Sequence, residues 1–167
     1  MVHQHFTLAD NLSVLDNVML GTESLWQPFS RRAAARQRLV AEGARFGLQV
    51  DPDRRVADLS VGERQRVEIL KALVRGARIL ILDEPTAVLT PQETEQLFVT
   101  LRRLRAQGTT ILLITHKLKE IMALCDAVTV MRAGRVVLDC AIASTGLDAL
   151  AEAMVGRKVH MGRVDEI

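Results

Sequence analysis

Two short stretches determine how this chain is organised: Leu59-Ser60-Val61-Gly62-Glu63 and Ile79-Leu80-Ile81-Leu82-Asp83-Glu84. The first places a glycine at the start of a helix that we expect from Glu63 to about Val74. The second is an apolar run that ends in two carboxylates. A single helix therefore lies between the two stretches. Its N-terminus is suited to binding a phosphate group, and the end of the strand that follows it is suited to a metal ion and water.

The helix start has the spacing of a capping box, in which the Ser60 hydroxyl accepts from the Glu63 N–H and the Glu63 carboxylate accepts from the Ser60 N–H. Gly62 leaves the backbone bare, so a ligand can approach closely. The N–H donors and partial positive charge of a helix N-terminus suit a phosphate. An ordinary capped helix is the alternative interpretation. The buried face is expected to carry Val67, Leu70, Ala72 and Leu73, and the solvent face Arg64, Arg66, Glu68 and Lys71.

The apolar run from Ile79 to Leu82 is typical of a strand buried on both faces, as in a parallel sheet. Asp83 and Glu84 follow it, and Pro85 ends regular strand pairing. Ligands of open α/β sheets bind at the carboxyl ends of strands. Neighbouring carboxylates can divide the chemistry there, since one can hold Mg²⁺ while the other accepts a proton from, or orients, an attacking water. A solvated strand end is the alternative for these residues taken alone.

Together the two stretches resemble the ATP-binding cassette (ABC) ATPases. LSVGERQRVEILKAL resembles the signature motif of that family, and ILILDEPTAVL resembles its Walker B motif. The resemblance implies that the cofactors are ATP and Mg²⁺, with Asp83 as a metal ligand and Glu84 as a catalytic residue. It also implies that Ser60, Gly62 and Glu63 bind nucleotide. The implied fold class is α/β, a partial P-loop NTPase (ABC ATPase) fold with a mostly parallel sheet and a helical subdomain.

The first residues are predicted to form the end of a strand that runs into a loop. His3 and His5 could be metal ligands, but no third ligand is evident, so a zinc site is not favoured. Gln4 matches the Q-loop glutamine of the family, which contacts Mg²⁺ and the attacking water. The stretch from Asn11 to Val18 resembles the family's segment after that loop. A catalytic and metal-binding role for Gln4 follows from the resemblance.

Residues 11–58 are predicted to be mainly helical. Ser13 can cap a short helix, and Ser30 can cap a second one that runs from about Arg31 to Phe46 and ends at Gly47. The segment resembles the family's helical subdomain, which carries the coupling surface for the transmembrane partner. A solvated helix face is the favoured interpretation of its basic residues, Arg31, Arg32, Arg36 and Arg38.

A second capping box follows the carboxylates, formed by Thr90 and Glu93 with Pro91 at the first helical position. This helix is expected to run to about Ala106 and to end at Gly108. The family's D-loop, which precedes this helix, usually ends in aspartate; Thr90 replaces it here, so cross-dimer aspartate chemistry is not implied. The expected buried residues are Leu97, Phe98, Leu101 and Leu104.

A second apolar strand, Thr109 to Thr115, ends at His116. A lone histidine is usually structural. This one would lie near a γ-phosphate if the sheet is parallel, and it matches the family's catalytic switch (H-loop) histidine.

The rest of the chain is expected to contain two helices and a hairpin. The first helix has Leu118, Ile121, Met122 and Leu124 inward, and the hairpin pairs residues 127–131 with 135–138. The last helix, over 144–155, is expected to bury Leu147, Leu150, Ala151, Met154 and Val155.

The sequence contains no G-x-x-x-x-G-K-[ST] stretch, the P-loop that cradles phosphates in ABC ATPases. We therefore expect part of a cassette that lacks the N-terminal P-loop strands and holds nucleotide weakly when alone. Exposed apolar edges are then expected to favour a non-native homodimer. The expected organisation is a Q-loop strand end (1–8), a helical subdomain with the signature helix (9–77), the C-terminal part of the ATPase core (78–156) and a linker or tail (157–167).

Composition bounds the class of protein. The chain has 167 residues, of which 49% are hydrophobic and 25% charged, as in a single soluble globular domain. A net charge of +2 and 3% aromatic residues do not favour nucleic-acid binding. Cys125 and Cys140 are expected to be reduced core residues. With no apolar run long enough for a membrane span and no signal peptide, a cytoplasmic location is expected.

Two further stretches, Glu84 to Glu93 and Ala153 to Arg157, resemble the first cassette of tandem ATPases of simple-sugar and nucleoside importers. The resemblance implies an ATPase subunit that couples ATP hydrolysis to solute uptake. It implies a second cassette and transmembrane permease subunits as partners, a solute-binding protein as an indirect one, and a position at the inner face of the membrane. One alternative is a non-catalytic interaction module that lends its signature helix to a partner cassette. Another is an ABC protein of DNA repair or translation, but the insertions frequent in those proteins are not seen.

Overall fold

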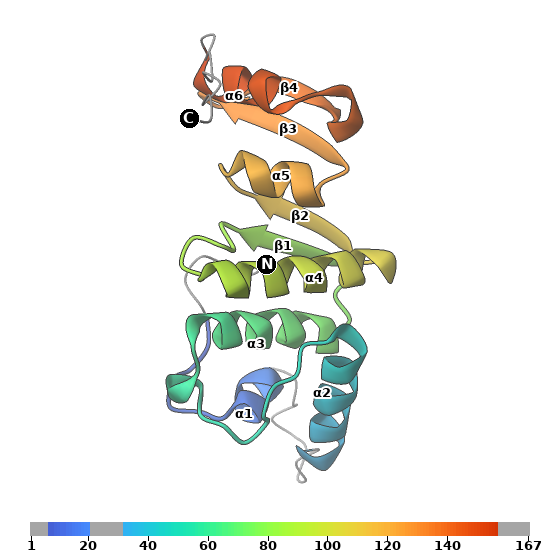
Figure 1. Cartoon of the computed structure of the whole chain (residues 1–167). Helices are drawn as coiled ribbons and strands as arrows, with labels where there is room; N and C mark the ends of the chain where they lie inside the picture. Colours follow the sequence, from blue (N-terminus) through green and yellow to red (C-terminus); the bar gives the residue numbers. More distant parts are fainter. Residues whose placement is uncertain (1–6, 21–31, 157–167) are drawn as a thin grey trace, which may run out of the picture. The chain divides into compact units, whose positions relative to one another are not determined.

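The computed structural model describes residues 7–20 and 32–156 (Figure 1). The chain divides into two compact units, residues 1–114 and 115–167, and each is described by itself. Several predictions lie outside the described residues: those for His3, Gln4, His5, the cap Ser30, the helix residue Arg31 and the tail 157–167.

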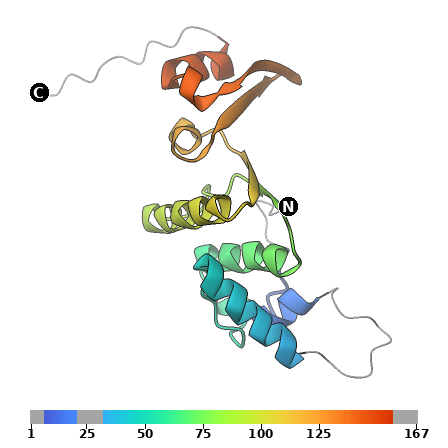
Figure 2. The same ribbon diagram turned by 90° about the vertical axis from the view of Figure 1, so that its right-hand side faces the viewer.

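The first unit is built mainly of helices: α1 (Val14–Met19), α2 (Arg32–Phe46), η1 (Val56–Asp58), α3 (Val61–Val74) and α4 (Pro91–Ala106). Helices α1, α2 and α3 pack against one another, and α4 packs against α2 and against strand β2 (Thr110–Ile114). Figures 1 and 2 show α3 and α4 side by side. The fully or almost fully buried apolar side chains of this unit include Leu15, Leu39, Leu70, Leu80 and Leu104.

The predicted helix ends are largely confirmed. Gly47 follows α2 with φ +70°, and Gly108 follows α4 with φ +89°, a left-handed conformation that favours glycine. Helix α4 has its expected bounds and buries the four predicted apolar side chains. Helix α3 begins at Val61, slightly before the expected Glu63, and ends at Val74 as expected.

One prediction for α3 is wrong. Glu68 was expected on the solvent face, but it is buried, with only 7% of its surface exposed. Its Oε1 accepts hydrogen bonds from the Thr7 N–H at 2.8 Å and the Thr7 hydroxyl at 2.9 Å. A buried carboxylate needs such donors. The donors come from a residue 61 positions away, so helical periodicity could not reveal them.

A parallel pair of strands, β1 (Ile79–Asp83) and β2 (Thr110–Ile114), runs in register from the Ile79–Thr110 pair to the Asp83–Ile114 pair. The α/β fold class with parallel pairing is therefore confirmed. The prediction that β1 is buried on both faces is wrong for the described residues. Leu80 and Leu82 are buried, whereas Ile79 is 63% exposed. Because side chains alternate along a strand, the helices of this unit cover only the face that carries Leu80 and Leu82.

The second unit contains α5 (Leu118–Leu124), the antiparallel strands β3 (Ala127–Arg132) and β4 (Arg135–Ala141), η2 (Ile142–Ser144) and α6 (Leu147–Val155). Its core is formed by Ile121, Val130 and Leu150. The turn contains Ala133 (φ +48°) and Gly134 (φ +74°), as a two-residue hairpin requires. The hairpin is longer than predicted on the β4 side, since pairing continues to Ala141.

The last helix also differs from its prediction. Helix α6 begins at Leu147 because residues 142–144 form a separate 3-10 turn. Leu150 is fully buried, but Leu147 is 40% and Val155 54% exposed, so they are not core residues of this unit. Gly156 ends the helix with φ +82°, as expected.

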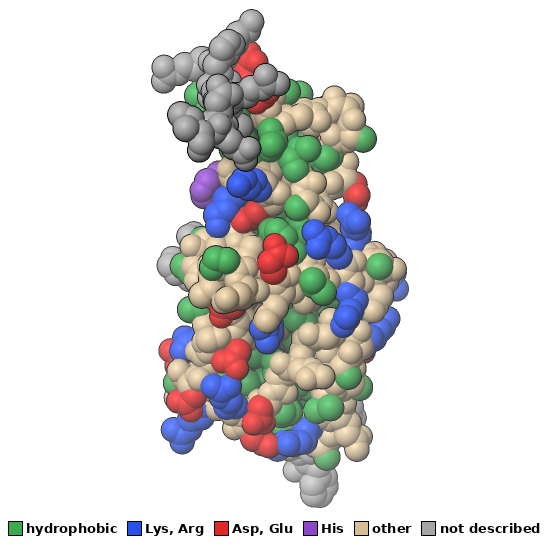
Figure 3. Space-filling view, in the orientation of Figure 1, with side chains coloured by type: hydrophobic (Ala, Val, Ile, Leu, Met, Phe, Trp, Pro, Cys, Tyr) green, Lys and Arg blue, Asp and Glu red, His purple; other side chains and the backbone are tan. Residues whose placement is uncertain are grey.

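The molecular surface mixes charges of both signs. On the face shown in Figure 3, basic and acidic side chains are interspersed among apolar ones. This pattern agrees with the small net charge of +2. Among the described residues, no helix combines the length and apolar character needed to cross a bilayer.

Candidate functional site

The start of α3 is a complete capping box. The Glu63 N–H donates to the Ser60 hydroxyl at 3.2 Å, and the Ser60 N–H donates to Glu63 Oε2 at 2.8 Å. Ser60 has extended backbone angles (φ −64°, ψ 164°), as an N-cap residue requires. The capping box predicted from the sequence is therefore confirmed, and the first turn of α3 is held in a defined conformation.

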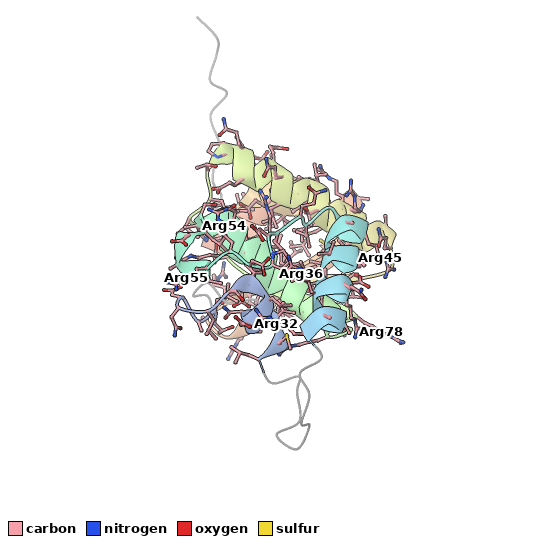
Figure 4. All side chains as sticks on the ribbon, turned by 90° about the horizontal axis from the view of Figure 1, so that it is seen from below. Arg32, Arg36, Arg45, Arg54, Arg55 and Arg78 are labelled. Atoms are coloured by element: carbon pink, nitrogen blue, oxygen red, sulfur yellow. The ribbon has the colours of Figure 1, made fainter. Side chains whose placement is uncertain are left out.

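The Glu63 carboxylate is also bound from the other side. Arg54, labelled in Figure 4, donates from Nη1 to Glu63 Oε1 at 2.7 Å and from Nη2 to the Asp58 carbonyl at 2.7 Å. The Ser60 N–H, followed by the Arg54 guanidinium, lowers the pKa of the Glu63 carboxyl below its ordinary value. Glu63 is therefore ionised at neutral pH and fixes the segment before α3.

The basic residues of α2 interact with acidic side chains at the surface. Arg36 donates from both terminal nitrogens to the carboxylate of Asp53 at 2.6 Å, and Arg32 pairs with Asp16. Both arginines are labelled on α2 in Figure 4. All four side chains are at least one-third exposed. The interpretation of Arg32 and Arg36 as part of a solvated helix face is confirmed.

The carboxyl end of β1 brings Asp83 and Glu84 to the edge of the parallel pair. Glu84 continues the pairing, because its N–H donates to the Ile114 carbonyl at 2.9 Å. Its φ of +46° is unusual for a residue with a side chain. Such strained backbone is concentrated at functional sites. One carboxylate oxygen of Glu84, Oε2, is buried, so this oxygen faces protein atoms rather than bulk water.

A buried side chain joins the two predicted motifs. Gln65, only 5% exposed, lies in the second turn of α3 and donates from Nε2 to the Pro85 carbonyl at 2.6 Å. This bond fixes the start of α3 relative to the segment directly after Glu84. Sequence reasoning missed Gln65. The signal in the sequence was its spacing. Gln65 lies one helical turn after Val61 and one turn before Ile69, so a polar residue stands in an apolar row of the helix.

In the second unit, the predicted switch residue His116 is exposed and lies between β2 and α5. The neighbouring Thr115 hydroxyl donates to Glu120 Oε2 at 3.1 Å and accepts from the Lys117 N–H at 3.1 Å. Glu120 is only 5% exposed. These bonds fix the turn that carries His116, and the sequence analysis did not identify Glu120.

The predicted site residues thus fall into three groups. Ser60, Gly62 and Glu63 lie together at the start of α3, and Asp83 and Glu84 lie together at the end of β1. Both groups belong to the first unit. His116 belongs to the second unit. The roles assigned to all these residues, and to Gln4, remain predictions.

The residues present are compatible with ATP and Mg²⁺. Mg²⁺ is usually held by one or two carboxylates together with phosphate oxygens and water, and Asp83 and Glu84 supply such carboxylates. A phosphate suits the N-terminus of a 14-residue helix with a glycine in its first turn, which Gly62 provides in α3. The chemistry of both donor sets therefore fits the cofactors that the resemblance implies.

Comparison with known proteins identifies the family. The sequence model described as ABC transporter matches residues 1–87, about half of the chain. The chain belongs to the ABC transporter family. A solved structure of CbiO1 from Clostridium perfringens, described as part of the ABC transporter complex CbiONQ, superimposes with a TM-score of 0.69 at 31% identity. The superposition covers 89% of this ABC chain and 57% of CbiO1, and it confirms the ABC ATPase fold.

Two curated relatives of this ABC chain are import proteins. It is 50% identical over 161 residues to the guanosine import ATP-binding protein NupO of Bacillus subtilis (strain 168). It is 46% identical over 159 residues to the nucleoside import ATP-binding protein NupA of Lactococcus lactis subsp. cremoris (strain MG1363). Each match covers 95% of this chain but 31% of the relative. The chain therefore spans about a third of the length of these relatives, and its predicted resemblance to sugar and nucleoside importer cassettes is confirmed.

Proposed function

We propose that this chain supplies part of the ATP-binding cassette of an importer for a sugar or a nucleoside-like solute. The observation that supports this proposal best is the connection between its two motifs. The capped start of α3 and the carboxylate end of β1 are joined by the Gln65–Pro85 hydrogen bond of 2.6 Å. This bond is a direct physical connection between the proposed phosphate-binding and metal-binding motifs, of the kind through which coupling between two sites is carried.

In the proposed mechanism, Mg-ATP supplies the phosphoryl group whose transfer to water releases the free energy for transport. Asp83 would hold the metal ion. Glu84 would orient the attacking water and accept its proton. His116 would contact the γ-phosphate, and Gln4 would contact the Mg²⁺ and the attacking water. The function of Ser60, Gly62 and Glu63 would be to bind the phosphates of the nucleotide held by a second cassette.

The proposed partners are a second cassette and transmembrane permease subunits, with a solute-binding protein acting through the permease. This assembly would place the chain at the inner face of the cell membrane. The proposed organisation keeps the predicted boundaries: residues 1–8, 9–77, 78–156 and 157–167. The importer names of the relatives support a sugar or nucleoside as the solute class.

Replacing Glu84→Gln at the chromosomal gene in the source cells tests this function. Uptake of radiolabelled pentoses, hexoses and nucleosides is compared with that of wild-type cells. We expect at least a tenfold loss of uptake for one solute class, because glutamine cannot accept the proton of the attacking water. Glu95→Gln, an exposed position on α4, is the matched control and should leave uptake unchanged.

Equal uptake in Glu84→Gln and wild-type cells, at equal protein abundance by immunoblot, would contradict the ATPase role. It would favour an interaction module that acts without turnover. Calorimetry with the purified chain adds an independent measurement. The 167 residues contain no P-loop sequence, so we expect Mg-ATP to bind to them only at millimolar concentrations.

A further inference from the structure

One carboxylate bridges the starts of two neighbouring helices. Glu93 belongs to the capping box of α4, and its Oε2 accepts from the Thr90 N–H at 3.0 Å and from the Thr90 hydroxyl at 3.1 Å. Its other oxygen, Oε1, accepts from the Ser60 hydroxyl of α3 at 3.3 Å. Each oxygen of Glu93 thus serves a different helix.

The same side chain lies directly over Gly62. A Cβ atom added to Gly62 would be 2.5 Å from Glu93 Oε1 and 2.8 Å from its Cδ. Only a residue without a side chain allows this approach. In this conformation, therefore, the bare backbone of Gly62 receives the carboxylate of Glu93.

The charge of Glu93 matches its position. The N–H of Thr90 is the main group that lowers the pKa of this carboxyl, and the hydroxyls of Thr90 and Ser60 and the backbone of Gly62 add to the effect. Glu93 is therefore ionised at neutral pH. Two helix N-termini, each with partial positive charge, face this one negative group.

A second contact joins the same helices one turn further on. Arg66 of α3 donates from Nη2 to Gln96 Oε1 of α4. This hydrogen bond does not involve Glu93, so the bridge at the helix starts is a separate feature. Substitutions at Glu93 therefore remove the bridge and leave both partners of the second contact unchanged.

The donors that Glu93 occupies are the ones the proposed function assigns to a phosphate. The Ser60 hydroxyl has a single proton, and this proton is directed at Glu93. A phosphate oxygen can accept this proton only when the hydrogen bond to Glu93 is broken. A phosphate next to the ionised carboxylate would also be repelled, since like charges a few Å apart interact unfavourably even when partly solvated.

We propose that Glu93 is an internal competitor that occupies the Ser60–Gly62 donors until a phosphate displaces it. Displacement breaks the bonds to Thr90 as well, so phosphate binding at α3 loosens the start of α4 and the adjoining segment after Glu84. This inference rests on the proposed function for the identity of the anion. In this proposal the contact of Glu93 with Ser60 and Gly62 is autoinhibitory. Its release at the start of α3 also changes the start of α4.

Titration of the purified ¹⁵N-labelled chain with inorganic phosphate and pyrophosphate at pH 7 tests the competition. The amide signals of Val61 and Gly62 report binding at α3. For Glu93→Gln we expect an affinity about tenfold higher than for wild type, because the variant loses the competing charge. Glutamine preserves the capping box of α4, so the variant should remain folded.

Two variants distinguish competition by Glu93 from a general effect of negative charge at the helix start and from an effect of capping α4. Glu63→Gln removes one negative charge from the same helix start but leaves the Glu93 bridge, so its affinity gain should be less than half that of Glu93→Gln. Glu93→Asp keeps the charge and the position in α4 but shortens the side chain by one methylene. It should release the Ser60 proton and raise the affinity between two- and fivefold.

Displacement of Glu93 by phosphate should also be visible in the spectrum of α4. In the wild-type chain the Thr90 amide signal should shift together with that of Gly62 as phosphate is added. The proposal is overturned if Glu93→Gln binds phosphate no better than wild type or than Glu63→Gln. It is equally overturned if neither protein shows binding up to 50 mM phosphate, about the weakest range that this titration resolves. None of these measurements depends on transport. The uptake test with Glu84→Gln can therefore contradict the proposed function while the titration supports the competition, and the titration can contradict the competition while the uptake test supports the function.

Discussion

The two capping boxes of the first unit begin from the same pattern and end in different roles. In each, the hydroxyl of the N-cap residue accepts from the N–H of the glutamate at 3.2 Å, and the glutamate accepts from the N–H of the cap. Glu63 uses its second oxygen for Arg54, close by in sequence. Glu93 uses its second oxygen for Ser60, 33 residues away. A capping motif therefore determines one oxygen of its glutamate, and tertiary packing determines the other.

The largest expected effect distinguishes the two cap residues. Ser60→Ala should lower the free energy of unfolding by about 2 kcal/mol, because it removes a helix cap and the link to Glu93. Thr90→Ala should cost about 1 kcal/mol, since the hydroxyl of Thr90 serves its own helix alone. Urea denaturation followed by circular dichroism measures both values. Equal losses for the two variants would show that the link between the helices contributes nothing to stability.

The capping boxes also show how far the sequence alone leads. The spacing of Ser60 to Glu63 and of Thr90 to Glu93 was sufficient to predict both helix starts. The parallel pairing of Ile79–Asp83 followed from an apolar run that ends in carboxylates and is confirmed. Each capping box depends on neighbours within a few residues, so a linear pattern contains it. The apolar run indicated a strand of a parallel sheet, but the partner residues of Ile79–Asp83 lie in β2, far along the chain, and the run itself does not identify them.

Contacts between distant residues could not be predicted in the same way. Glu68 was placed on the solvent face because its helix position matched charged neighbours, yet Thr7 supplies its hydrogen-bond donors. Gln65 was not singled out, because its acceptor is the carbonyl of Pro85 rather than a group in its own helix. The bridge from Glu93 to Ser60 belongs to the same class. A single sequence contains no record of which helices pack side by side, and these contacts depend on that packing.

A smaller effect is expected at Gly62, where the two boxes meet. Alanine is favoured over glycine in a helix by up to about 1 kcal/mol. Here its Cβ would lie 2.5 Å from Glu93 Oε1, so the carboxylate must move and lose its bond to Ser60. We expect Gly62→Ala to be nearly neutral in the wild-type background, because the lost bond between Glu93 and Ser60 offsets the gain of alanine over glycine. In a Glu93→Ala background, where this bond is already absent, the same change should stabilise the chain by up to about 1 kcal/mol.

The double-mutant cycle of Gly62→Ala and Glu93→Ala measures this coupling directly. Gly76→Ala is not a suitable control, because φ at Gly76 is +79° and alanine would be strained there for another reason. Gly146 is unsuitable as well, because it is the N-cap of α6, where glycine is favoured over alanine. The control is therefore the Glu93→Ala background, which removes the carboxylate that an added Cβ would meet. If Gly62→Ala changes the stability by the same amount with and without Glu93, the close approach of the carboxylate is not what requires a glycine.

The smallest expected effect is the response of the two glutamates to acid. The folded chain lowers the pKa of both Glu63 and Glu93 below the ordinary value of 4.5. Each glutamate therefore adds stability at and above this pH, and the contribution is lost as the pH falls below 4.5 through the lowered pKa. Both side chains are partly exposed, so solvent screening limits each contribution to about 0.5 kcal/mol.

Urea unfolding at pH 7.0 and pH 3.0 measures these contributions. Between the two pH values, Glu93→Gln and Glu63→Gln should each lose about 0.5 kcal/mol less stability than the wild-type chain. The double variant should lose about 1 kcal/mol less, because the two carboxylates accept from different N–H groups. A double variant whose acid response equals that of either single variant would instead show that the glutamates titrate as one group at the start of α3. The charges of Glu63 and Glu93 would then act together, although one glutamate binds Arg54 and the other binds Ser60 of the neighbouring helix.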